Sequence, residues 1–184
     1  GEARFDCSAL HRLWDQARRE IEGIVGHRVQ LEIEPGRFLV AEAGVLVAEV
    51  RATKRVAGNL FALVDAGFHN LVRPAMYGSW HEISVLRDGR ALSGPRQPTI
   101  LAGPLCESGD VFTQGDGATV LPRELPETRV GDLVVLHDTG AYGSAMASNY
   151  NTHALAPEVL IERGVPRLIR RRQTLDALLD LEEI

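Results

Sequence analysis

From residue 45 onward, short β-branched or apolar segments alternate with tight-turn residues, and this alternation constrains the fold more than any other feature. The turn signals are Asp88-Gly89, Gly94-Pro95, Gly115-Asp116-Gly117 and Gly131-Asp132. Short strands at this spacing predict a β-sandwich or β-barrel. The 18 Gly and 9 Pro residues also favour a turn-rich β fold over a helical bundle. The predicted strands are residues 45–50, 60–64, 83–86, 99–102, 118–121, 133–136 and 158–161.

The first 45 residues have a different pattern, typical of an α/β unit. Apolar residues at helical spacing predict a helix over residues 8–25, with Ser8 as its N-cap and Gly26 as its stop. Residues 29–33 alternate like a strand, and residues 38–43 predict a short helix or turn. One strand and two helices cannot close a core of their own. We therefore expect residues 1–45 to be the remnant of a larger α/β domain and residues 46–184 to form a mainly β domain.

Composition excludes several classes of function. A formal net charge of −5 and 5% aromatic residues argue against a nucleic-acid-binding surface. No apolar run approaches the length of a membrane span, and no signal peptide is visible. The two cysteines, Cys7 and Cys106, are too few for a disulfide scaffold, so we expect a reduced, cytoplasmic protein. We predict no metal site, because the six His residues form neither an HExxH motif nor a Cys/His cluster at zinc spacing.

Four segments carry side chains suited to ligand binding, and the first two suit an anion. A Gly next to an Arg after a strand can present backbone N–H groups and a guanidinium to phosphate or carboxylate. This pattern occurs at Glu34-Pro35-Gly36-Arg37. Arg73 and Tyr77, four residues apart, could contact one anionic ligand. For each segment alone, an ordinary turn with surface side chains is the simpler alternative.

The other two segments are rich in glycine. Residues 103–110 place Cys106 beside Glu107 and near Asp110, in a turn typical of functional loops. The alternative is a small buried thiol with Glu107 and Asp110 in a solvated turn. Residues 140–144 place Tyr142 between small residues, which leaves a ring face open to a flat ligand, or else the ring packs in a core. The sequence contains no GxSxG, Walker A or GxGxxG motif, so hydrolase, P-loop and Rossmann functions have no support.

Together and in this order, the four segments are far more specific than any one of them. The chain resembles the C-terminal part of the diaminopimelate decarboxylase family, which consists of fold-type III pyridoxal-phosphate (PLP) enzymes of bacterial lysine synthesis. The sequences of its motifs are similar to those of the proteobacterial branch of this family. The resemblance covers essentially the whole chain. The matching segments read LEIEPGRFLVAEAGVLV, LVDAGFHNLVRPAMYGSWHEI, GPLCESGDVF, LHDTGAYGSAMASNYN and RLIRRRQT.

The resemblance implies that residues 1–45 are the end of an alanine-racemase-like (β/α)8 barrel and that residues 46–184 are the family's C-terminal β-domain. It implies a homodimer with shared active sites, in which Cys106 and Glu107 complete the partner's site. It implies cofactor contacts from Glu34, Pro35, Gly36, Arg37 and Tyr142. It implies substrate contacts from Arg37, Arg73, Tyr77, Glu107 and Tyr142. Proton transfer during turnover is implied for Cys106.

One element of the family's site is missing from this chain. The family's Schiff-base lysine lies on an early barrel strand, whereas the only lysine here, Lys54, matches a strand of the β-domain. We expect Lys54 to be a solvated strand residue and the chain alone to be inactive, with the upstream barrel half of the same protein as its partner. The expected reaction is conversion of meso-2,6-diaminopimelate to L-lysine and CO2. The alternatives are an ornithine- or arginine-type decarboxylase, and a non-catalytic, decarboxylase-like binding or regulatory domain.

Overall fold

The computed structural model describes residues 5–183. The chain divides into two compact units, residues 1–35 and residues 36–184. None of the helices within the described range combines the length and apolarity that a bilayer-spanning segment requires.

The first unit consists of helix α1 (Cys7–Val25) and an extended segment. The helix begins one residue earlier than predicted, and its N-cap is Asp6 rather than Ser8. The Asp6 carboxylate accepts the Ala9 N–H at 2.9 Å, which satisfies a free donor of the first turn. Gly26 ends the helix with φ of 72°, as predicted, and donates its N–H to the Glu22 carbonyl.

The predicted strand at residues 29–33 is wrong. These residues carry no ladder within the described chain, and the Val29 N–H is instead accepted by the Glu22 carboxylate at 2.9 Å. An alternating sequence supplies one face of a strand but cannot supply the neighbouring strand on which a ladder depends.

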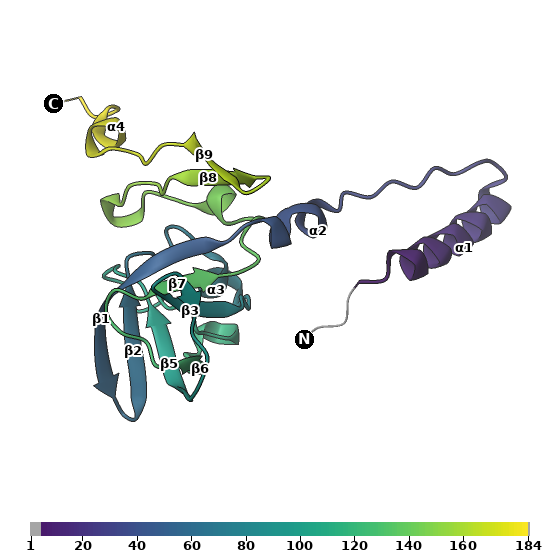
Figure 1. Ribbon diagram of the computed structural model, residues 1–184. Helices are drawn as coiled ribbons and strands as arrows, with labels where there is room; N and C mark the ends of the chain where they lie inside the picture. Colours follow the sequence, from purple (N-terminus) through teal and green to yellow (C-terminus); the bar gives the residue numbers. More distant parts are fainter. Residues whose placement is uncertain (1–4, 184) are drawn as a thin grey trace. The chain divides into compact units, whose positions relative to one another are not determined.

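The second unit is built on a seven-stranded sheet in the order β4-β3-β7-β1-β2-β5-β6 (Figure 1). All neighbouring strands are antiparallel except β2 and β5, which are parallel. A separate hairpin pairs β8 with β9. The strands are β1 (Leu46–Val56), β2 (Asn59–Val64), β3 (Ile83–Arg87), β4 (Arg90–Ala91), β5 (Arg96–Ala102), β6 (Arg123–Pro126), β7 (Leu133–Leu136), β8 (Glu158–Glu162) and β9 (Val165–Arg170).

Short helices lie before, between and after the strands of the second unit. They are α2 (Gly36–Val40), η1 (Ala41–Ala43), α3 (Arg73–Tyr77), η2 (Asp116–Ala118), η3 (Ser144–Met146), η4 (Tyr150–Thr152) and α4 (Leu175–Leu179). Helix α2 agrees with the helix or turn predicted over residues 38–43, and α4 is capped by the Thr174 hydroxyl, which accepts the Ala177 N–H at 3.1 Å.

Three hairpins of the second unit turn on two residues that both have positive φ. The pairs are Ala57-Gly58, Asp88-Gly89 and Arg163-Gly164. Such turns match the right-handed twist of antiparallel strands, and a glycine at the second position adopts this backbone without steric cost. Asp88-Gly89 was among the predicted turn signals.

The core lies on one face of the curled sheet. Alternate residues of β2 point inward, so Leu60, Ala62 and Val64 are buried. Strand β3, near one edge of the sheet, lies close to β6 at the other edge. The Arg123 guanidinium of β6 donates to the carbonyl of His81, just before β3. The mainly β fold class is thereby confirmed. The core cluster comprises Ala48, Val50, Ala62, Val64, Ala66, Leu71, Ile83, Leu101, Phe112, Leu125, Val134 and Leu136.

The strand prediction fails at residues 118–121. Gly117 and Ala118 both have positive φ, of 66° and 60°, inside the turn η2, and the segment contributes only an isolated bridge between Gln114 and Val120. The strand of this region is β6, shifted by five residues to Arg123–Pro126, which ends at a proline at the outer edge of the sheet. Strands β4 and β9 were also missed, whereas the strands predicted at 45–50, 60–64, 83–86, 99–102, 133–136 and 158–161 are confirmed.

Candidate active site

The short helix α3 places Arg73 between two aromatic rings. The Arg73 guanidinium carbon lies 5.5 Å from the centroid of the Tyr77 ring and 5.1 Å from that of Tyr142. Its Nη2 donates to the Ser79 hydroxyl at 3.3 Å. Three residues predicted from two separate segments are thereby brought together in one group. A half-buried guanidinium flanked by two half-exposed phenol rings forms a docking point for a carboxylate.

The two ends of α3 explain why this group is ordered. Pro74 occupies the first turn, where its missing N–H costs nothing, and its side chain is buried. Gly78 ends the helix with φ of 62° and donates to the carbonyls of Arg73 and Pro74. A Cβ on Gly78 would lie 2.9 Å from the Asp116 nitrogen, so the end of α3 lies directly against the η2 turn.

Tyr142 has a strained backbone. Its φ of 60° is unusual for a residue with a side chain, and it falls between the buried Ala141 and Gly143. A Cβ on Gly143 would lie 2.4 Å from the Thr139 carbonyl oxygen, so the turn is wound tightly around Tyr142. The tyrosine side chain is 44% exposed, so its ring remains available to a ligand.

The turn that carries Tyr142 is bonded to the segment that follows Arg37. The Thr139 N–H donates to the Gly44 carbonyl at 2.9 Å, and the Gly140 N–H donates to the Ala41 carbonyl at 3.0 Å. Arg37 belongs to α2, directly before this segment, and its side chain is exposed. Of the predicted EPGR motif, Gly36 and Arg37 belong to the second unit, whereas Glu34 and Pro35 belong to the first and line an open hollow of about 540 Å³ there together with Leu10, Trp14, Glu32 and Ile33.

Cys106 and Glu107 lie in an exposed turn between β5 and the bridge residue Val111. Both cysteines of the chain are free and exposed, so the alternative of a buried thiol at Cys106 is wrong. One Glu107 oxygen accepts weak hydrogen bonds from the Ser108 hydroxyl at 3.3 Å and the Gly109 N–H at 3.4 Å. Most of the acceptor capacity of this carboxylate therefore faces solvent. Asp110 differs from the expected solvated turn, because it is only 3% exposed.

A cluster of buried and partly buried polar groups lies beside Arg73 and was missed by sequence reasoning. His81 Nδ1 lies 2.8 Å from the His137 carbonyl, and His137 Nε2 lies 2.8 Å from the Ser84 hydroxyl. Burial lowers the pKa of His81, and the positive charges of Arg73 and Arg123 act in the same direction. Burial also lowers the pKa of Arg123 to about 10, so it stays charged at neutral pH over the Trp80 ring, 3.3 Å from its centroid. The only sequence signal was the Trp80-His81 pair shortly after Arg73.

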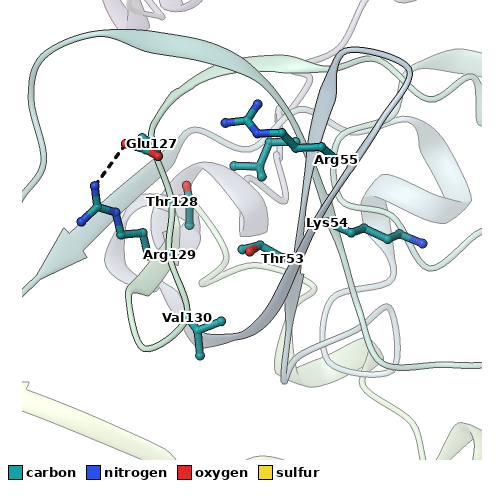
Figure 2. A pocket seen from close by; sticks show the side chains of 8 residues that line it. Thr53, Lys54, Arg55, Glu127, Thr128, Arg129 and Val130 are labelled. Carbon is teal, nitrogen blue, oxygen red and sulfur yellow. Dashed lines mark hydrogen bonds and ion pairs between the residues drawn. The ribbon is translucent and has the colours of Figure 1, made fainter.

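Lys54 lies in β1 and is exposed, as predicted, with its Nζ 5.2 Å from the centroid of the Phe61 ring. Figure 2 shows the hollow of about 260 Å³ that residues 53–55 share with residues 127–130, and the Lys54 side chain extends away from the Glu127–Arg129 ion pair. Within residues 5–183, no three His, Cys, Asp or Glu side chains gather in a group that could hold a metal ion.

The chain is similar to several known proteins over almost its whole length. Diaminopimelate decarboxylase of Escherichia coli K12 is 58% identical over 184 residues, which are 99% of this chain and 44% of that protein. A crystal structure of diaminopimelate decarboxylase superimposes with a TM-score of 0.91 at 58% identity, over 99% of this chain and 44% of that one. The Helicobacter pylori enzyme complexed with L-lysine gives a TM-score of 0.74 at 35% identity, over 92% of this chain and 39% of that one.

The chain thus spans less than half the length of these relatives. Its residues 16–140 match the model of the C-terminal sheet domain of pyridoxal-dependent decarboxylases. These residues include the second half of α1, the whole seven-stranded sheet, Arg73, Tyr77 and Cys106, whereas Tyr142 lies two positions beyond them. The chain therefore belongs to the pyridoxal-dependent decarboxylase family, as its C-terminal sheet domain.

Proposed function

We propose that this chain is the C-terminal part of a PLP-dependent decarboxylase that converts meso-2,6-diaminopimelate to L-lysine and CO2. The observation that carries the proposal is the Arg73 guanidinium held between Tyr77 and Tyr142. Diaminopimelate has a carboxylate at each end, whereas ornithine and arginine have no distal carboxylate for this guanidinium to bind. The high identity to diaminopimelate decarboxylases over almost the entire chain supports the same substrate.

The residues present fit PLP in part. Arg37 is exposed, and a Cβ on Gly36 would meet nothing within 4 Å, so the start of α2 leaves open space beside a guanidinium suited to phosphate. We propose that Glu34, Pro35, Gly36 and Arg37 contact the phosphate and that the open Tyr142 ring contacts the cofactor and substrate. When bound, PLP accepts the electron pair that remains when CO2 departs.

The side chains of this chain would then bind and orient the substrate and deliver a proton. Arg37, Arg73 and Tyr77 supply cationic or hydroxyl donors to the substrate carboxylates. Glu107, whose carboxylate is exposed, accepts hydrogen bonds from the distal ammonium. The Cys106 thiol, in the same turn, delivers a proton to the carbon that lost CO2.

The proposed site also needs groups from outside this chain. Lys54, the only lysine, lies exposed in β1 with its Nζ over the Phe61 ring of β2, so we propose that the Schiff-base lysine comes from the upstream barrel half of the same protein. We propose that residues 1–45 are the end of that barrel and residues 46–184 the sheet domain. We also propose a homodimer in which Cys106 and Glu107 complete the partner's site, and a cytoplasmic location, which suits two free cysteines.

The test is CO2 release from meso-diaminopimelate in the presence of PLP. The enzyme is this chain joined to the part of the E. coli relative that precedes the aligned segment, called the joined enzyme below. L-ornithine, L-arginine and L-lysine serve as competing substrates, and this chain alone is the matched control. Release by the joined enzyme only, fastest on diaminopimelate, is the expected result. Faster release from ornithine would overturn the substrate assignment, and no release from any of the four would favour a non-catalytic binding domain.

A further inference from the structure

Asp110 is a buried carboxylate for which the proposed reaction has no role. It follows the Cys106–Glu107 turn by three residues, yet it is only 3% exposed. A buried charge without partners would be very unfavourable, so its contacts indicate what it does in the fold.

The Asp110 carboxylate joins two loops that are distant in sequence. Its Oδ1 accepts the Phe68 N–H at 2.7 Å, and its Oδ2 accepts the Leu105 N–H at 2.8 Å. Phe68 lies in the loop between β2 and α3, the helix of Arg73, whereas Leu105 directly precedes Cys106. The backbone of Asp110 closes the second loop, because its N–H donates to the Glu107 carbonyl at 3.1 Å and its carbonyl accepts the Gly103 N–H at 2.9 Å.

Two glycines make the space for this carboxylate. A Cβ on Gly103 would lie 2.2 Å from Asp110 Oδ2, and a Cβ on Gly67 would lie 2.7 Å from the same atom. Neither glycine has φ in the left-handed region, so the turn conformation alone does not require glycine at either position. Glycine is needed at both positions because any side chain there would collide with the Asp110 carboxylate. One of the two glycines lies in each loop.

Backbone donors hold the Asp110 carboxylate in place, and within residues 5–183 it forms no ion pair. Burial raises the pKa of Asp110, and the hydrogen bonds from the Leu105 and Phe68 amides oppose this change. His69, next to Phe68, is also buried and packs on His153, with ring centroids 4.7 Å apart. The backbone N–H groups are therefore the partners that fix the orientation of the carboxylate.

We propose that Asp110 is a positioning residue that fixes the Cys106–Glu107 turn relative to the loop that leads into the Arg73 helix. The proposal rests on the proposed function, because that function gives Cys106 and Glu107 their roles in proton delivery and ammonium binding. Asp110 touches neither substrate nor cofactor in this scheme. It acts through the backbone N–H groups of Phe68 and Leu105, one in each of the two loops.

The first test measures amide hydrogen exchange of the joined enzyme, comparing wild type with Asp110→Asn and Asp110→Ala. Protection of the Phe68 and Leu105 amides should fall at least about tenfold, because each variant removes acceptors that hold these N–H groups. Asp132→Asn is the matched control, since Asp132 is equally buried but accepts from Arg87 and Arg129 instead. It should leave Phe68 and Leu105 protected. Unchanged protection in both Asp110 variants would overturn the proposal.

The second test changes the loop of Phe68 and leaves Asp110 itself unaltered. Gly67→Ala adds a methyl group next to the carboxylate without changing Asp110, Cys106 or Glu107, and it should expose the Leu105 amide as Asp110→Ala does. In an Asp110→Ala background there is no carboxylate for the new methyl group to displace. Gly67→Ala should therefore have little further effect on Leu105 exchange in that background. Equal effects in both backgrounds would contradict the claim that Gly67 makes room for the Asp110 carboxylate.

The third test separates positioning from general damage. Displacing catalytic groups by a fraction of their working distance lowers kcat/KM for diaminopimelate by about ten- to a hundredfold, and we expect such a loss in Asp110→Asn and Gly67→Ala. The PLP affinity, read from the cofactor absorbance, should not change, because the proposed phosphate contacts lie elsewhere. Wild-type kcat/KM in both variants would overturn the proposal. If the wild-type joined enzyme releases no CO2, the proposed function fails, and the exchange measurements alone decide whether Asp110 fixes the turn.

Discussion

Gly44 and Gly140 lie backbone against backbone: a Cβ on Gly44 would lie 2.5 Å from the Gly140 Cα, and a Cβ on Gly140 would lie 2.0 Å from the Val40 carbonyl oxygen. This approach joins the segment after Arg37 to the turn of Tyr142, through the Thr139–Gly44 and Gly140–Ala41 hydrogen bonds. The position of Arg37, a proposed phosphate contact, relative to Tyr142 therefore depends on glycine at both positions.

Gly140→Ala is expected to separate these two segments. The three atoms nearest to the new methyl group are all backbone atoms, so relief requires movement of the chain itself. PLP affinity of the joined enzyme should fall at least about tenfold, since the misplacement reaches both sets of contacts. Absorbance titration with PLP measures this. Gly23→Ala, in α1 with nothing within 4 Å of its Cβ, is the control and should bind PLP normally. Normal binding by Gly140→Ala would contradict the expectation.

Arg73→Lys should weaken substrate use while sparing the fold. A lysine keeps the charge but loses the planar guanidinium that lies over the Tyr77 and Tyr142 rings and reaches Ser79. We expect kcat/KM for diaminopimelate to fall by about tenfold or more, equivalent to about 1.4 kcal/mol or more of transition-state binding. Steady-state kinetics of the joined enzyme measure the change. Arg90→Lys, at an exposed position of β4, should retain wild-type kinetics.

Asp132→Asn should reduce stability in a pH-dependent way. Arg87 donates to both Asp132 oxygens, at 2.7 and 2.8 Å, and this pairing lowers the pKa of Asp132. Because the folded-state pKa is below the unfolded value, the stabilisation is complete above the unfolded pKa of about 4 and is lost as pH falls through the folded pKa. Urea unfolding of the chain at pH 7 and at a pH below the lowered folded-state pKa of Asp132 should show a large difference from wild type only at pH 7.

The control for this variant is Asp88→Asn, because Asp88 lies exposed in a hairpin turn with φ of 50°, a conformation that asparagine also tolerates. It should match wild type at both pH values. A wild-type to Asp132→Asn difference that grows on acidification would show that the ion pair does not stabilise the folded chain.

His69 should make the folded chain sensitive to mild acid. Burial, and then the nearby His153, lower the pKa of His69 to about 4, so the folded state holds it neutral. The unfolded chain binds a proton below pH of about 6.5, so stability is complete above that value and falls toward pH 4, by up to about 3 kcal/mol. Urea unfolding of His69→Gln should show a smaller loss over this range than wild type. His11→Gln, on the exposed side of α1, should lose as much as wild type.

The strands of the sheet were largely predictable because their signal is local. Leu60–Val64 is an unbroken apolar run closed by turn residues, and it forms β2 with alternate residues buried, while Lys54 was correctly predicted to be an exposed residue of a strand. The errors occur where local sequence is not decisive. Residues 118–121 are strand-like in composition, but the positive φ at Gly117 and Ala118 turns the chain away from the ladder. Residues 29–33 have strand alternation but no neighbouring strand within the described chain.

The candidate site was predictable as a set of motifs but not as a geometry. Arg73 and Tyr77 share one helix, so their proximity follows from their spacing, whereas the approach of Tyr142 depends on the whole sheet. Asp110 was missed for the same reason. Its sequence neighbours indicate an exposed turn, and the Phe68 amide that it binds lies 42 positions away.

The parallel pairing of β2 with β5 has a consequence for how this site can diverge. Two parallel neighbours finish at the same edge of a sheet, and Leu63 pairs with Ala102, so the chain leaves both strands side by side before entering the loops of Phe68 and Cys106. An insertion or deletion in either loop would change how far its side chains reach without shifting the register of the ladder beneath. A change of length in either loop can therefore move the Cys106–Glu107 turn without altering the strands beneath it, provided that Asp110 and its two glycines are kept.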